Sequence, residues 1–184
     1  MEFEPCDIAA VVRIKPKRFG DARGYFVETF RQDLFDRYIG RQVFVQDNQS
    51  LSAERGTVRG LHFQIAPKAQ GKLVRCIAGA LLDIAVDIRP GSPSFGRHVA
   101  VELSAENGHQ LWVPAGFAHG FCTLVANTQI SYKVTDYYSP QQDRGLLWND
   151  PELQIAWPVE TGRAVLSDKD KILPTLAEWS AQDR

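Results

Sequence analysis

The stretch Gly108-His-Gln-Leu-Trp-Val-Pro-Ala-Gly-Phe-Ala-His119 decides the fold class of this chain of 184 residues. Its apolar run at residues 110–113 predicts a short strand, and Pro114 and Gly116 mark the turn that follows. Similar short runs, separated by turn residues, recur at residues 25–30, 43–48, 72–77, 81–88, 99–103, 120–125 and 129–135. Many short strands without regularly alternating helices are typical of an antiparallel sandwich or barrel.

Two helical segments interrupt this strand pattern. Residues 31–39 carry apolar side chains at positions 34, 35, 38 and 39, the spacing of one helical turn. A terminal helix is expected from Thr175. The run at residues 81–88 has two faces, one with Asp83 and Asp87 and one apolar, formed by Leu82, Ile84, Val86 and Ile88.

Composition excludes several classes of protein. Hydrophobic residues make up 44% and charged residues 23% of the chain, an ordinary globular balance. The net charge is −1, so no global basic field favours nucleic acid or a membrane surface as a partner. The three cysteines are far apart and form no CxxC pair, which argues against a disulfide framework or a zinc ribbon. With no signal-like start and no apolar run of membrane-spanning length, the chain is expected to be cytoplasmic.

Two histidine-containing segments carry the chemical signal. Residues 108–119 fit Gly-x5-Pro-x-Gly-x2-His, the second signature of the cupin superfamily, and residues 56–64 resemble the first signature. In the first signature, however, Gln64 stands where metal-binding cupins have a second His, so that only His62 and His119 remain. Two imidazoles make a poor transition-metal site, because catalytic sites use three protein ligands. No metal is therefore predicted, and His98 and His109 are expected to be peripheral.

More specific motifs surround these signatures. They are FGDARGYF at residues 19–26, FVQDN at 44–48, VRGLHFQ at 58–64, GKLVR at 71–75, YK at 132–133 and YYSP at 137–140. Together they resemble the dTDP-4-dehydrorhamnose 3,5-epimerase family from about residue 19 to residue 170. The resemblance implies a mainly β, antiparallel jelly-roll (cupin-like) barrel with a few short helices. It also implies a single domain over residues 1–184, with an N-terminal strand extension and a C-terminal helical tail.

The reaction that the resemblance implies inverts C3 and C5 of dTDP-4-dehydro-6-deoxy-D-glucose in dTDP-L-rhamnose biosynthesis. Both carbons flank the C4 ketone, which acidifies their protons, so no cofactor is required. The chemistry needs a base, donors to the enolate oxygen and an acid on the opposite ring face. The family implies His62 as proton acceptor, Tyr132 as proton donor and Lys72 at the enolate oxygen, with His119 nearby. Asp170 is the expected carboxylate behind His62, and Asp168 and Asp83 remain alternatives.

The resemblance also implies a set of substrate-binding residues. They are Phe19, Arg23, Glu28, Gln46, Asn48, Arg59, Lys72, His119, Tyr138, Asp143 and Lys169. Arg23 and Arg59 are expected at the diphosphate, because guanidinium groups match phosphate oxygens. Tyr138 is expected to stack on thymine, with Phe19 adding to that wall. Glu28 and Asp143 would meet hydroxyls or base edges, although the sequence around Asp143 departs from the family pattern.

The family further implies a homodimer in which N-terminal strands cross to the neighbour and Arg23 completes the neighbour's pocket. The strand expected at residues 11–14 is the candidate for this crossing. Three other functions remain open: an epimerase acting on one carbon or a related keto isomerase, a catalytically silent sugar-nucleotide-binding cupin, and a metal-dependent cupin enzyme. Gln64 in the ligand position argues against the third.

Overall fold

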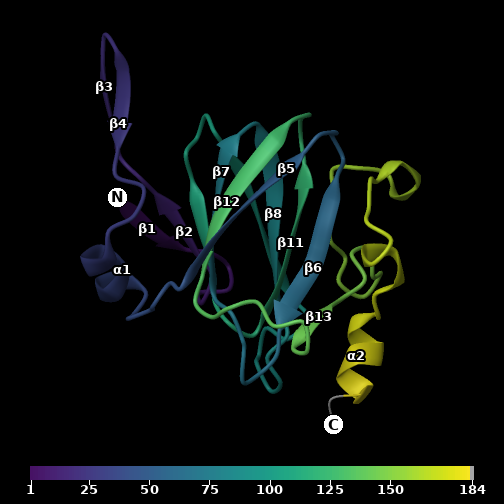
Figure 1. The fold of residues 1–184 in the computed structure, drawn as a ribbon. Helices are drawn as coiled ribbons and strands as arrows, with labels where there is room; N and C mark the ends of the chain where they lie inside the picture. The colour runs from purple at the N-terminus through teal and green to yellow at the C-terminus, as the bar shows by residue number, and fades with distance from the viewer. Residues whose placement is uncertain (183–184) are drawn as a thin grey trace.

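The computed structural model describes residues 1–182, which form two facing antiparallel sheets (Figure 1). One sheet has the order β1 (Glu2–Pro5), β2 (Val12–Lys15), β10 (Gln110–Val113), β7 (Lys72–Ala78), β12 (Thr128–Val134), β5 (Gln46–Ser52). The other has the order β13 (Asp143–Gly145), β6 (Val58–Gln64), β11 (Phe117–Thr123), β8 (Ala80–Asp87), β9 (His98–Ser104). The predicted antiparallel jelly-roll barrel with a few short helices is confirmed.

The main core fills the space between the two sheets. Val74 and Leu111 from the six-stranded sheet meet Leu81, Leu103 and Phe117 from the five-stranded sheet, and all are buried. This apolar packing closes one part of the barrel and leaves the rest to polar side chains. The sheets therefore provide a rigid frame around a polar cavity.

Two further layers cover the outer faces of the sheets. Helix α1 (Gln32–Tyr38) places Phe35 edge-on against Trp112 of the six-stranded sheet, with ring centroids 5.2 Å apart. On the other side, the C-terminal segment and helix α2 (Leu176–Gln182) cover the five-stranded sheet, where Trp179 packs on Phe63. The remaining helical turns are η1 (Thr161–Arg163) and η2 (Asp170–Ile172). Both predicted helices are confirmed.

Part of the N-terminal region leaves the body of the molecule. Within residues 1–182, strands β3 (Arg18–Asp21) and β4 (Gly24–Val27) pair only with each other, and Figure 1 shows their hairpin projecting from the barrel. The crossing strand expected at residues 11–14 lies elsewhere: β2 pairs with β1 and β10 of its own chain. The segment that reaches out is thus the hairpin that carries Arg23.

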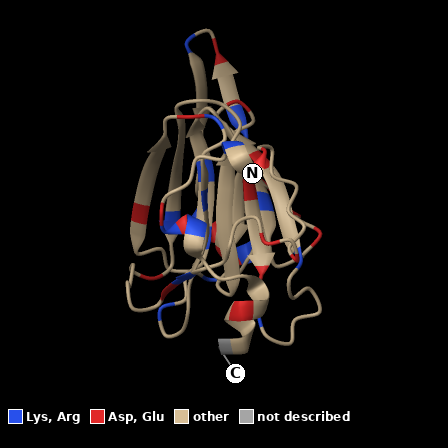
Figure 2. Cartoon of the chain, turned by 90° about the vertical axis from the view of Figure 1, so that its right-hand side faces the viewer, with Lys and Arg blue, Asp and Glu red and all other residues tan. Residues whose placement is uncertain are grey.

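Charged residues of both signs are interspersed over the molecule in the view of Figure 2, as the net charge of −1 suggests. No helix within residues 1–182 is long and apolar enough to cross a membrane.

Candidate active site

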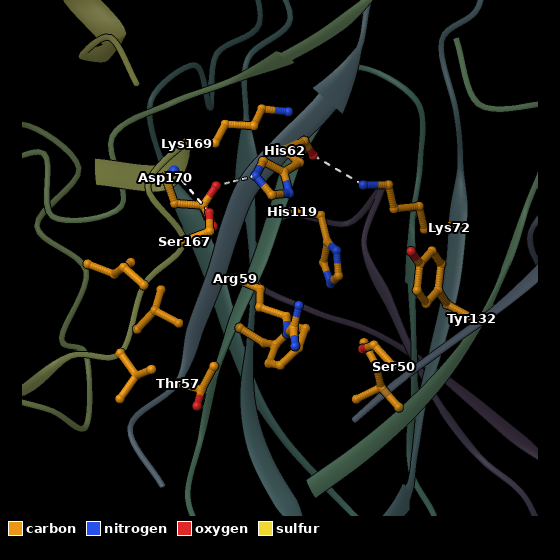
Figure 3. A pocket seen from close by; sticks show the side chains of 15 residues that line it. Ser50, Thr57, Arg59, His62, Lys72, His119, Tyr132, Ser167, Lys169 and Asp170 are labelled. Carbon is orange, nitrogen blue, oxygen red and sulfur yellow. Dashed lines mark hydrogen bonds and ion pairs between the residues drawn. The ribbon is translucent and has the colours of Figure 1, made fainter. Parts of the chain in front are cut away.

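A polar cavity opens between the sheets as two adjoining pockets of about 440 and 350 Å³. Both pockets are lined by His62, Lys72, Tyr132 and Lys169, and Figure 3 shows these side chains in the larger pocket. The cavity brings together most of the predicted site residues, which are Gln46, Asn48, Arg59, His62, Lys72, His119, Tyr132, Tyr138, Asp143, Lys169 and Asp170. The sequence separation of these residues shows that the barrel topology, not local sequence, assembles the site.

His62 on β6 forms a hydrogen-bonded pair with Asp170, the first residue of η2. The His62 Nε2 to Asp170 Oδ1 distance is 2.6 Å, and Asp170 is 2% exposed. Burial alone would raise the pKa of Asp170, but the hydrogen bond and charge of His62 and the hydroxyl of Ser167 outweigh burial and lower that pKa. Because the carboxylate is ionised, Nε2 carries the proton, and Nδ1 is the ring atom free to accept one.

The two alternative carboxylates have other partners. Asp168 is exposed and pairs with Lys171 at 2.8 Å. Asp83 on β8 is fully buried and lies 2.8 Å from Nε2 of His119, a residue of β11. Its second oxygen, Oδ2, has no hydrogen-bond partner within residues 1–182. Asp170 is therefore the carboxylate that meets His62, and Asp83 holds His119 in the same way.

Lys72 and Tyr132 face His62 from the six-stranded sheet (Figure 3). The Lys72 ammonium donates a hydrogen bond of 3.1 Å to the backbone carbonyl of His62. Burial lowers the pKa of Lys72 to about 8, although the charges of Asp143 and Asp83 act in the opposite direction. Burial also raises the pKa of the Tyr132 phenol, which stays protonated at neutral pH. An imidazole with a free ring nitrogen and a protonated phenol thus lie on opposite walls of one cavity.

Arg59 and Tyr138 lie at opposite ends of strand β5. Arg59 donates to the Ser52 hydroxyl at 3.0 Å, and Ser52 is the last residue of β5. The Tyr138 backbone N–H donates to the Gln46 side chain at 3.3 Å, and Gln46 is the first residue of that strand. Six residue steps along a strand correspond to about 20 Å. Tyr132 pairs with Asn48, so Tyr132 lies between the two ends of the strand.

Comparison with known proteins gives a consistent assignment. The family model described as dTDP-4-dehydrorhamnose 3,5-epimerase matches residues 5–178. A protein of that description from Sinorhizobium fredii is 60% identical over 178 residues, which cover 97% of this chain and 91% of the relative. The chain belongs to the dTDP-4-dehydrorhamnose 3,5-epimerase family. It is accordingly an isomerase.

Solved structures of related enzymes agree with this family assignment. The Legionella pneumophila dTDP-6-deoxy-D-glucose-3,5-epimerase in complex with dTDP-4-keto-L-rhamnose is 43% identical, with a TM-score of 0.93 and coverage of 98% of this chain and 95% of that one. A 3'-monoepimerase from Streptomyces bikiniensis in complex with dTDP-quinovose is 34% identical, with a TM-score of 0.91 and coverage of 98% and 90%. The fold of the epimerase family therefore also carries epimerisation at one carbon.

Three residues expected in this epimerase site lie outside the cavity of their own chain. Phe19 and Arg23 belong to the projecting hairpin and its turn, and Glu28 follows directly after β4. The Arg23 side chain is 90% exposed and pairs only with Asp21 of the same turn among the described residues. The peripheral positions expected for His98 and His109 agree with the structure, where neither residue lines the cavity.

The structure adds cavity residues that the sequence analysis did not single out. Ser50, Thr57, Phe121, Ile130 and Ser167 line the pocket on the Arg59 side. Of these, Ser167 could have been noticed from the sequence, because a Ser three residues before an acidic residue is typical of a helical N-terminus. Within residues 1–182, no group of three or more His, Cys, Asp or Glu side chains could hold a metal ion.

Proposed function

We propose that this epimerase inverts both C3 and C5 of dTDP-4-dehydro-6-deoxy-D-glucose, which gives dTDP-4-dehydro-L-rhamnose for dTDP-L-rhamnose biosynthesis. One observation carries the proposal: the His62–Asp170 pair and the Tyr132 phenol face each other across one cavity. Inversion at carbon needs a proton removed from one face and returned to the other. A base and an acid on opposite walls meet that requirement.

In each epimerisation, Nδ1 of His62 takes a proton from the carbon next to the C4 ketone. The C–H electron pair forms a double bond to C4, the π pair of the C4 carbonyl moves onto its oxygen to give the enolate, and His62 becomes an imidazolium that the Asp170 carboxylate stabilises. Tyr132 then gives its phenolic proton to the opposite face of the same carbon, which restores the ketone. Proton exchange with water returns His62 and Tyr132 to their starting states, and a second round inverts the other carbon.

The enolate oxygen needs donors while its charge exists. The Lys72 ammonium lies beside His62 and is the cation best placed for this role, and His119, whose Nε2 is engaged by Asp83, lines the same cavity. Removing one donor to a developing oxyanion costs about 3–4 kcal/mol in comparable enzymes. In this proposal the negative charge on the enolate oxygen is stabilised by groups that the barrel holds in place before the substrate binds.

The position of the nucleotide follows from the two ends of β5. The reacting sugar lies at one end of a nucleotide sugar, so thymidine diphosphate extends to only one side of His62 and Tyr132. We place thymine against Tyr138, where Gln46, Asn48 and Asp143 offer polar edges. The diphosphate then passes Lys169, and Arg59 faces the sugar from the other side. This role differs from the one that the sequence analysis expected for Arg59, which was to bind the diphosphate.

A homodimer completes this proposal. The hairpin leaves Phe19, Tyr25 and Phe26 more than half exposed, and a two-stranded hairpin is only marginally stable without a surface to cover. We propose that it packs on a second copy, where Phe19, Arg23 and Glu28 join the neighbour's cavity. Arg23 would add the second cation that a diphosphate requires.

The three cysteines are free thiols, which fits the cytoplasm as the compartment.

Proton NMR of the substrate incubated with enzyme in D₂O tests the reaction. We expect deuterium at both C3 and C5, and no incorporation with His62→Asn. Deuterium at one carbon only would make the chain a single-carbon epimerase, a function that the same fold supports in the Streptomyces bikiniensis enzyme. No incorporation, with dTDP still bound, would leave a silent sugar-nucleotide-binding protein.

A further inference from the structure

The position of Gln64 marks where this chain departs from metal-binding cupins, and the structure gives that side chain a different task. Gln64 is only 6% exposed and follows His62 by two residues on β6. Its amide nitrogen donates to the carbonyl of Lys68 at 2.6 Å and to the carbonyl of Tyr137 at 3.2 Å. Its amide oxygen accepts the backbone N–H of Ser139 at 2.7 Å.

These three hydrogen bonds hold the two loops at the mouth of the cavity. One partner belongs to the loop between β6 and β7, and the other two flank Tyr138 on either side. Tyr138 itself is 58% exposed, and its backbone N–H is held by Gln46. The aromatic ring thus stands on a segment whose backbone is held by the amides of Gln64 and Gln46, and its hydroxyl donates to Asp143 at 3.3 Å.

We propose that Gln64 is a positioning residue that fixes Tyr138 in the orientation in which it stacks on the base of the nucleotide. The inference rests on the proposed function in one respect, the stacking role of Tyr138. A ring that is already oriented loses less conformational entropy on binding, so this arrangement raises affinity without new contacts to the ligand. The same hydrogen bonds use both amide protons of Gln64 and direct its amide oxygen to the backbone N–H of Ser139.

The test compares Gln64→Leu with the control Thr128→Val. Thr128 is also buried, and its hydroxyl also contacts two backbone carbonyls, those of Ala80 and Val125, but it does not line the cavity. We expect Gln64→Leu to weaken dTDP binding and raise KM roughly 2- to 12-fold, less than the loss expected for Tyr138→Ala, with kcat changed less than about threefold. Thr128→Val should lower the melting temperature to a similar degree and leave dTDP affinity unchanged.

Two further measurements separate this proposal from the proposed function. Hydrogen exchange of the peptide at residues 136–141, measured without ligand, should accelerate in Gln64→Leu and not in Thr128→Val. In a Tyr138→Ala background, Gln64→Leu should change dTDP affinity less than about twofold, because the ring that it orients is gone. Unchanged exchange, or an equal loss of dTDP affinity in both backgrounds, would overturn the proposal.

Failure of the base site itself would look different. If Tyr138→Ala alone binds dTDP as tightly as the wild type, the stacking role is wrong, and the orienting role falls with it. The exchange result would then still show whether Gln64 fixes the loop. If Gln64→Leu does not fold, Gln64→Glu keeps the size of the side chain and the acceptor for Ser139. It places an oxygen against two carbonyls, and the same changes in exchange and affinity are expected.

Discussion

At the scale of single residues, buried charge sets how this enzyme should respond to pH. Burial lowers the pKa of Lys72 to about 8, while the phenol of Tyr132 has its pKa raised. As pH rises through about 8, Lys72 loses the proton that makes it a donor to the enolate, while Tyr132 stays protonated. We therefore expect kcat/KM to fall above about pH 8, well below the range in which a tyrosine ionises.

The control for this prediction uses the carboxylate that acts on Lys72. The charge of Asp143 raises the pKa of Lys72 against the effect of burial. Replacing Asp143 by Asn should move the alkaline fall of kcat/KM to lower pH, because the negative charge that stabilises the Lys72 ammonium is then lost. Two results would show that ionisation of Lys72 does not cause the fall in kcat/KM. One is a fall at the same pH in Asp143→Asn as in the wild type, and the other is a wild-type fall only at the pH at which a tyrosine ionises.

At the scale of elements, alternation in the sequence predicted most strands, and its failures have physical causes. The run at residues 120–125 began three residues too late, because β11 (Phe117–Thr123) is buried on both faces and shows no alternation. Four strands were missed, namely the short β1, β3 and β13 and also β6, which carries His62. On β8, the apolar residues Ile84 and Val86 face the C-terminal segment, whereas Asp83 turns inward toward His119. Alternation defines two faces of a strand but does not say which one a second layer covers.

For the site too, the sequence pattern predicted some features and only the fold decides others. The family resemblance predicted His62 and Tyr132 as site residues, and the fold brings both to one cavity, while their roles as base and acid stay a prediction. The partner of His62 lies 108 residues away, so only the fold decides between Asp170, Asp168 and Asp83. The hydrogen bond between Asp83 and His119 was not predicted, since nothing local links a β8 carboxylate to a β11 imidazole.

The close approach of β6 and β11 fixes both histidines of the site and can be tested at one glycine. Gly60 has φ +114°, and a Cβ atom there would lie 2.6 Å from the His119 carbonyl oxygen and 2.6 Å from the Gly120 Cα. We expect Gly60→Ala to lower the free energy of unfolding by roughly 2–5 kcal/mol, through an unfavourable backbone conformation and overpacking. In urea unfolding, Gly162→Ala is the control, because a Cβ there meets nothing within 4 Å. Equal midpoints for the two variants would contradict the prediction.

The two ends of β5 give a second prediction at this scale. If thymine lies at Tyr138 and the sugar lies between Tyr132 and Arg59, the two side chains act on different parts of the substrate. Tyr138→Ala should weaken binding of dTDP by roughly 5- to 100-fold, since stacking on a base is lost. Arg59→Met should leave dTDP affinity within about threefold and lower kcat/KM for the full substrate. Calorimetric titration with dTDP separates the two, and a large loss of dTDP affinity in Arg59→Met would return that residue to the diphosphate.

At the scale of the whole molecule, the proposed homodimer predicts that each cavity takes Arg23 from the hairpin of the neighbour, and mixing two defective variants tests this. Arg23→Ala removes the cation that we assign to the neighbour's cavity, and His62→Asn removes the base of its own cavity. Each variant alone should be nearly inactive. In a mixed dimer, one cavity has His62 from one copy and Arg23 from the other, so refolding an equal mixture should restore roughly a quarter of wild-type activity. A mixture that stays inactive although mixed dimers form would show that Arg23 serves its own chain or none.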